Sequence, residues 1–268
     1  MAVSYHHTAP LSQPAGENTQ AYFSLRQGTK LVLFVHGYSG DYNGTWNEFQ
    51  AHIRKDIRFI DTDIVYYGYA SRCGQIGEHT DDLLTFVRSI VVNRLNYSNA
   101  SGPDWSGYES IVIVAHSMGA VLTRKAMLVA NNDHDDWVER TRMVLFAPAH
   151  MGTGVVKNVL ANIHWLVRVF AAILSTASMP IAELDPKLSE IIPDLKTNTQ
   201  RLLERGKGDF TKAFRLIWAV GDLVVTNDFF GEDPQPDKIK GKTHQSVCKP
   251  DQSTFQKPFV KLVEAITL

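Results

Sequence analysis

Residues 110–130 read SIVIVAHSMGAVLTRKAMLVA and carry the strongest structural signal in the chain. The first half is a short run of apolar, mostly β-branched residues without alternation, which is typical of a strand buried on both faces of a sheet. The second half places apolar side chains at helical spacing. The stretch therefore predicts a strand, a sharp turn and a helix, with Ser117 at the apex of the turn.

Similar apolar runs predict further buried strands at residues 30–36, 63–67, 143–147 and 214–220, and a short last strand is expected at 237–242. Segments of helical length alternate with them, at residues 46–57, 80–95, 117–130 and 254–266. Strands that alternate with helices indicate βαβ units, an α/β fold and a mainly parallel sheet of about six strands. Residues 1–28 are polar and mixed, and we expect an irregular leader there.

The length fits a single domain over residues 1–268, because one α/β domain often fills a chain of this size. One segment breaks the alternation of strands and helices. Residues 148–210 insert about 60 residues between the fourth and fifth predicted strands, where a simple crossover needs far fewer. We predict that this insertion forms a helical cap or lid on the sheet domain.

Composition excludes several classes of protein. The chain is 44% hydrophobic and 21% charged with a formal net charge of −1, so it lacks the basic excess of a nucleic-acid-binding protein. Cys73 and Cys248 are too few for a disulfide framework, and they follow predicted strands at opposite edges of the sheet, which argues against a bond between them. The first residues show no secretory signal, so we expect a cytoplasmic location.

The predicted turn gives Ser117 the surroundings of a nucleophile. Small residues are needed two positions before and after such a serine because backbones crowd there, and Ala115 and Gly119 meet this need, with alanine in place of the usual glycine. The helix that follows directs backbone N–H groups and its positive dipole end at the serine, which favours developing negative charge. We therefore expect Ser117 to act as a nucleophile.

A serine hydroxyl is a weak nucleophile that needs a base and a residue to orient the base, in the chain order serine, acid, histidine. Asp222 directly follows the fifth strand, at the edge where active sites of parallel sheets are found, and His244 follows the next loop. We expect these two residues to fill the roles. Asp228 and Asp194 are the alternatives for the acid.

A glycine follows the first strand and lets the backbone turn beneath the nucleophile. This residue is Gly37, and the next backbone N–H is that of Tyr38. Because Met118 follows the serine at the start of the helix, we expect the N–H groups of Tyr38 and Met118 to form an oxyanion hole.

Three histidines end or follow predicted strands. His36 is expected to hold the oxyanion loop rather than to act as the base. We expect the His116 side chain to point away from the apex of the turn, and His150 follows the fourth strand. Together with Gly37, these two histidines are candidates for substrate binding. A metal cluster of the three histidines is an alternative, but the close ligand spacing typical of metal sites is missing, so we expect no metal and no other cofactor.

Five motifs resemble those of the α/β-hydrolase superfamily, in its lipase and esterase branch. They are HGYSG at 36–40, AHSMG at 115–119, APAHMGT at 147–153, GDLVV at 221–225 and THQSV at 243–247, and they span most of residues 30–250. The resemblance implies the strand order 2-1-3-4-5-6, with the two N-terminal strands of larger members absent or reduced. By position it makes Ser117 the nucleophile, Asp222 the acid and His244 the base. Tyr38 and Met118 become the oxyanion donors.

The resemblance implies a serine ester hydrolase that cleaves a carboxylic ester through an acyl-enzyme. GTW at 44–46 and YGY at 67–69 are similar to the narrower lipase-like group that includes inositol deacylases. The same three residues could serve an acyltransferase, a thioesterase or a peptidase, because a fold does not fix a substrate. A non-catalytic interaction protein on this fold is the alternative from another class.

Residues 155–174 predict an amphipathic helix within the insertion, with its apolar side chains on one side. One interpretation is a lid whose apolar face covers the Ser117 pocket and meets a membrane or a partner protein when open. The other is a helix packed on its own domain. Polar residues make the segment unlike a transmembrane helix, among them Lys157, Asn162, His164 and Arg168. The expected substrate is a lipid ester or another small-molecule ester.

Overall fold

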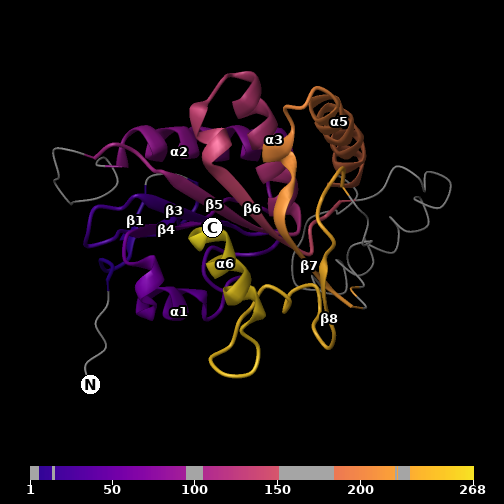
Figure 1. The fold of residues 1–268 in the computed structure, drawn as a ribbon. Helices are drawn as coiled ribbons and strands as arrows, with labels where there is room; N and C mark the ends of the chain where they lie inside the picture. The colour runs from indigo at the N-terminus through magenta and orange to yellow at the C-terminus, as the bar shows by residue number, and fades with distance from the viewer. Residues whose placement is uncertain (1–5, 14–15, 95–104, 151–183, 221, 223–229) are drawn as a thin grey trace.

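The computed structural model describes residues 6–13, 16–94, 105–150, 184–220, 222 and 230–268. Within these residues lies an eight-stranded sheet with the order β1-β2-β4-β3-β5-β6-β7-β8 (Figure 1). Its strands are β1 (Leu11–Ser12), β2 (Gln20–Tyr22), β3 (Lys30–Val35), β4 (Thr62–Tyr67), β5 (Ser110–His116), β6 (Thr141–Phe146), β7 (Ala213–Ala219) and β8 (Asp237–Ile239). β3 to β8 pair in parallel, whereas β1 and β2 are antiparallel.

The six parallel strands have the predicted order, with β4 outside β3 and the others following on the opposite side. Both faces of these strands are covered. In β3, Leu31 and Leu33 belong to one hydrophobic core, and Val32 and Phe34 belong to the other. This double burial explains why the strands appear in the sequence as continuous apolar runs.

The N-terminal segment differs from the expectation. Residues 1–28 are expected to be irregular, but β1 and β2 form there, and β2 pairs antiparallel with β4. Strands of two and three residues are too short to show a periodic pattern. The described sheet therefore has eight strands rather than about six, and the two N-terminal strands are reduced rather than absent.

Helices cover both faces of the sheet, as Figure 1 shows. One side carries α2 (Ile76–Val92), α3 (Met118–Asn132) and α5 (Leu184–Glu204), and the other carries α1 (Phe49–Lys55) and α6 (Lys257–Thr267). Short 3₁₀ helices lie at Ile57–Phe59, Asp136–Arg140 and Asp209–Thr211. α1 is shorter than the predicted helix at 46–57, because it begins at Phe49 and ends at Lys55, where the extended backbone of Asp56 interrupts the helix before the 3₁₀ turn.

α2 begins at Ile76, before the predicted start at residue 80. The Gln75 backbone N–H donates a hydrogen bond of 2.8 Å to the Glu78 carboxylate, and the Gln75 side chain accepts one in return. This reciprocal cap satisfies backbone N–H groups that the start of a helix leaves unpaired. The helix therefore begins at the cap and not at the first residue of the apolar pattern.

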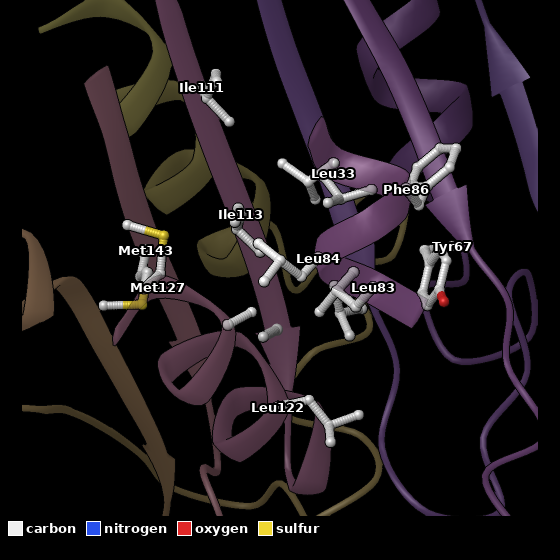
Figure 2. Close-up of a cluster of buried hydrophobic side chains, with 14 of the residues drawn as sticks. Leu33, Tyr67, Leu83, Leu84, Phe86, Ile111, Ile113, Leu122, Met127 and Met143 are labelled. Atoms are coloured by element: carbon white, nitrogen blue, oxygen red, sulfur yellow. The ribbon is translucent and has the colours of Figure 1, made fainter. Parts of the chain in front are cut away.

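The core between the sheet and the helices α2 and α3 fixes the central strand. Figure 2 shows buried side chains of these elements facing one another, among them Leu33, Ile113, Leu84, Leu122 and Met127. Because these apolar contacts hold α3 against β5, they also fix the turn between the two elements. That turn contains Ser117.

The described part of the insertion contains α5 and the start of the 3₁₀ helix Asp209–Thr211. The predicted helix at 155–174 lies outside the described residues. Among the described helices, none combines the length and the apolar character that a membrane span requires. Both cysteines are free thiols: Cys73 is exposed in the loop after β4, and Cys248 is buried in the segment after β8.

Candidate active site

Ser117 lies at the sharp turn between β5 and α3. Its backbone has φ 53° and ψ −120°, which is a strained conformation for a residue with a side chain. The end of β6 holds this conformation: the Ser117 N–H donates to the Phe146 carbonyl at 3.0 Å, and the Ser117 carbonyl accepts from the Ala149 N–H at 3.2 Å. Residues 110–130 thus form the predicted strand, turn and helix.

Two glycines allow the backbones to approach one another at this turn. A Cβ atom on Gly119 would lie 2.4 Å from the carbonyl oxygens of both Val35 and His36, so α3 could not pack so closely on the end of β3. A Cβ atom on Gly37 would lie 2.8 Å from Cβ of Ser117. Gly37 therefore lies directly against the serine, and only a residue without a side chain fits at this position.

Ser117, His244 and Asp222 are joined by hydrogen bonds. Ser117 Oγ lies 2.9 Å from His244 Nε2, and His244 Nδ1 lies 2.9 Å from Asp222 Oδ2. A carboxylate only accepts hydrogen bonds, so Nδ1 carries the proton and Nε2 accepts the bond from the serine hydroxyl. Ser117 and His244 are buried, and the Asp222 side chain is 0% exposed. The structure thus brings together the three residues singled out from the sequence.

The acid and the base follow neighbouring strands. Asp222 follows β7 and its N–H closes a turn on the Ala219 carbonyl at 3.2 Å, whereas His244 lies in the segment between β8 and α6. Of the alternatives for the acid, Asp194 is exposed on α5, and Asp228 lies outside the described residues. Among the described aspartates, Asp222 is the one hydrogen-bonded to His244.

The expected oxyanion donors belong to the two segments that meet at the serine turn. Met118 is the first residue of α3, where a backbone N–H has no partner within the helix. Tyr38 follows Gly37 in a loop that His36 supports, since His36 Nδ1 lies 2.9 Å from the Gly37 carbonyl oxygen. The Tyr69 hydroxyl donates to the His36 carbonyl at 2.8 Å, and the two rings stack at 4.3 Å. Burial lowers the pKa of His36, which keeps it neutral.

His116 and His150 are both buried, and they contact different partners. His116 Nε2 lies 2.9 Å from the backbone carbonyl oxygen of His244, and His150 Nε2 accepts a hydrogen bond of 3.1 Å from Arg124. Burial lowers the pKa of both imidazoles, that of His116 to about 3. In the described part of the chain, no three histidine, cysteine or acidic side chains gather in a way that could hold a metal.

A buried ion pair beside His150 is not among the predicted features. Arg124 of α3 pairs with Asp233 at 2.5 Å, and its guanidinium lies 4.2 Å from the ring centroid of Phe230. The sequence pointed to this pair only through an arginine within an otherwise apolar helical pattern. Its partner is 109 residues away in the chain, so the sequence pattern does not identify it.

Two solved structures with a similar fold cover almost the whole chain. The peroxisomal α/β-hydrolase Lpx1 from Saccharomyces cerevisiae has a TM-score of 0.54 at 12% identity, over 96% of this chain and 85% of its own. A monoacylglycerol lipase from Paleococcus ferrophilus has a TM-score of 0.53 at 13% identity, over 92% of this chain and 97% of its own. These similarities establish the α/β-hydrolase fold. Comparison with curated proteins gives no significant match.

A sequence family matches most of the region that carries the predicted motifs. The match covers residues 26–205, which include the Gly37 loop and the serine turn, and the family is described as "Putative serine esterase (DUF676)". Because the match spans well over half of the 268 residues, the family assignment applies to the chain as a whole. The protein is therefore a member of this serine esterase family, built on the α/β-hydrolase fold.

Proposed function

We propose that the protein hydrolyses carboxylic esters, with Ser117 as the nucleophile, His244 as the base and Asp222 as the acid that orients the base. The observation that carries this proposal is the pair of 2.9 Å hydrogen bonds linking the three side chains in that order. The strained backbone of Ser117 supports this proposal, and so does the membership of the protein in a serine esterase family.

In the first half of the reaction, Ser117 Oγ attacks the ester carbonyl carbon while His244 Nε2 takes the hydroxyl proton. The negative charge that forms on the carbonyl oxygen is stabilised by the backbone N–H groups of Tyr38 and Met118. The Asp222 carboxylate stabilises the charged imidazole of His244. The bond to the alcohol then breaks, and His244 gives its proton to the leaving oxygen, which leaves an acyl group on Ser117.

In the second half, a water molecule attacks the acyl carbon and His244 takes one of its protons. The bond from the acyl carbon to Ser117 Oγ breaks, the carboxylic acid leaves, and the proton returns to the serine. Both halves use the same base and the same backbone N–H groups. The chemistry therefore needs no cofactor.

The proposed substrate is a lipid ester or another small-molecule ester. The apolar, amphipathic pattern of residues 155–174 supports an acyl-chain substrate, because a lid with an apolar face suits a lipid. The similar lipase from Paleococcus ferrophilus is described as acting on monoacylglycerols. We extend the proposal to a lid formed by the insertion at 148–210 that contacts a lipid surface when open.

The test begins with a fluorophosphonate probe, which reacts with activated serines. We expect mass spectrometry to place the adduct on Ser117, and we expect no adduct in Ser117→Ala. Ser246→Ala is the matched control, because Ser246 lies two residues from His244 and bonds to Thr243 instead. An adduct on another serine would contradict the assignment of the nucleophile.

A substrate series then identifies the reaction. p-Nitrophenyl esters with acyl chains from two to sixteen carbons are compared with a p-nitroanilide of the same acyl group. The proposal predicts hydrolysis of esters, with a preference for longer chains, and little cleavage of the anilide. Preferred cleavage of the anilide would identify a peptidase instead, and labelling without turnover of any ester would contradict ester hydrolysis.

A further inference from the structure

His116 is the last residue of β5 and directly precedes Ser117. It is 7% exposed, its Nε2 lies 2.9 Å from the backbone carbonyl oxygen of His244, and the centroids of the two imidazole rings are 4.8 Å apart. A carbonyl oxygen only accepts hydrogen bonds, so His116 Nε2 is the donor. His116 thus holds the backbone of His244. Both ring nitrogens of His244 remain available for Ser117 and Asp222.

We propose that His116 is a positioning residue, which holds the loop of His244 so that Nε2 of His244 stays within hydrogen-bond reach of Ser117. The proposal rests on the proposed function, in which His244 is the base. His116 itself does not touch the reacting atoms.

The base needs such a support because of where it lies in the fold. His244 follows β8, a strand of three residues that pairs with β7 and forms the edge of the sheet among the described strands. Ser117 follows β5, which is paired on both sides at the centre of the sheet. The hydrogen bond from His116 connects the two positions directly, so the segment after a short edge strand is fixed to the central strand.

The other side of the His116 ring faces the oxyanion loop. A Cβ atom on Gly37 would lie 3.2 Å from His116 Nδ1 and 2.8 Å from the Ser117 Cβ atom. His116 therefore lies between the loop of Gly37 and the loop of His244. The His116 side chain thus lies beside both of the loops that meet at the nucleophile.

The charge state of His116 suits this role. Burial, followed by the nearby His244, lowers the pKa of His116 to about 3, so the ring is neutral at neutral pH. His244 becomes positively charged during the proposed reaction. A second positive imidazole at a ring distance of 4.8 Å would oppose that charge, whereas a neutral donor does not.

The chain provides a matched control at the opposite end of the sheet. His7 is also buried, its Nε2 lies 2.9 Å from the Thr62 backbone carbonyl oxygen, and burial lowers its pKa. Thr62 is the first residue of β4, whereas the active-site residues follow the other ends of the strands. Replacing His7 therefore tests the loss of a buried histidine without disturbing the base.

The first experiment compares His116→Phe, which removes the donor, with His116→Gln, which keeps an amide donor. With a p-nitrophenyl ester, we expect His116→Phe to lower kcat by about 10²-fold and to change KM by less than about threefold, because a small displacement of a catalytic group has effects of this size. His116→Gln should regain most of kcat. His7→Phe should lower the melting temperature and leave kcat unchanged.

The second experiment observes the base without any turnover. The proton on His244 Nδ1, bound to Asp222, should give a downfield proton NMR resonance that disappears in His244→Ala. We expect it to be lost or broadened in His116→Phe and to persist in His116→Gln and His7→Phe. If the wild-type protein neither hydrolyses esters nor labels at Ser117, but this pattern holds, the proposed function fails and the positioning role stands.

Three results would overturn the positioning role. One is a His116→Phe variant with wild-type kcat and an unchanged resonance, even if its melting temperature falls, because His116 would then only fill space. Another is an equal loss of kcat in His116→Phe and His116→Gln. The third is an equal loss in His7→Phe.

Discussion

At the amino end of the parallel sheet the Asp63 carboxylate is surrounded by donors, whereas at the carboxyl end the Asp222 carboxylate begins a series of hydrogen bonds that ends at a serine. Asp63 accepts bonds from the Ser24 N–H at 2.8 Å, the Tyr108 hydroxyl at 2.8 Å and Arg94 Nη2 at 2.9 Å. Arg94 Nε also donates to it. The Asp63 side chain is 0% exposed, as is that of Asp222.

Burial of a carboxylate is therefore common to both ends and does not by itself create a reactive site. At the amino end, the positive charge of Arg94 balances the Asp63 carboxylate, which accepts all of these hydrogen bonds and passes none on to a reactive group. At the carboxyl end, a histidine takes the place of the arginine, so the partner can gain and lose a proton. The histidine contacts a serine held in a strained turn. We expect substitutions at the two ends to affect different properties.

The largest expected effect is at the carboxyl end. Ser117→Ala and His244→Ala should each lower kcat by about 10⁴- to 10⁶-fold, because the three residues act as a unit. Asp222→Asn should cost about 10⁴-fold, since an amide favours the wrong imidazole tautomer. Ester hydrolysis measures the activity of each variant, and melting curves measure its stability. Turnover near the wild-type rate in any of the three, with folding intact, would contradict the assignment.

The second effect is at the amino end and concerns stability. Asp63→Ala leaves Arg94 buried without its partner, which should cost about 3–5 kcal/mol of the free energy of unfolding. Urea unfolding measures this change. The folded fraction should keep its kcat. A loss of kcat comparable to that in Ser117→Ala, at matched folded fraction, would show that the two ends are coupled and would break the distinction between them.

A smaller effect is expected where the backbones meet beneath the serine. Gly37→Ala places a methyl group 2.8 Å from Cβ of Ser117, so the loop or the serine must move. We expect kcat to fall by about 10²-fold, as for a displacement of about 1 Å in a catalytic group. Gly77→Ala is the control, because the nearest atom of the described residues that its added methyl group meets is Lys125 Nζ, at 3.8 Å. Equal kcat values in the two variants would show that the close contact at Gly37 is not needed.

The last effect is a pH dependence of stability. Burial lowers the pKa of His36, His116 and His150, so the unfolded chain binds more protons than the folded chain once the pH falls below about 6.5. The stabilisation that these neutral imidazoles provide should be complete above that pH. It should decrease on acidification towards the pKa values of the folded state, of which that of His116 is about 3. Urea midpoints from pH 7.5 to pH 5 measure the slope.

The histidines also distinguish the two ends in this experiment. His150→Gln should make the slope shallower by removing one buried imidazole, and His7→Gln should do the same at the amino end, where burial also lowers the pKa. Because more of these histidines lie at the carboxyl end, variants there should together account for most of the slope. An unchanged slope in His150→Gln would contradict this account.

Much of the parallel sheet and of the hydrogen-bonded group could be predicted from local patterns. Ser117 was identifiable because a strand, a turn and a helix are encoded in one continuous stretch, and Asp222 because it directly follows an apolar run. The bond from His116 to His244 could not be found in this way, since it spans 128 residues. The pairs of Arg124 and Arg94 with their acids depend on tertiary packing in the same manner.

The two cysteines give the protein a built-in measure of its own folding. Cys73 is exposed, whereas Cys248 is buried and burial raises the pKa of its thiol to about 12, so a maleimide should modify Cys73 alone in the folded state. Unfolding makes the second thiol accessible. The number of modified cysteines per chain then reports the folded fraction of any variant, and a dye on Cys73 provides a single attachment point in the loop that follows β4.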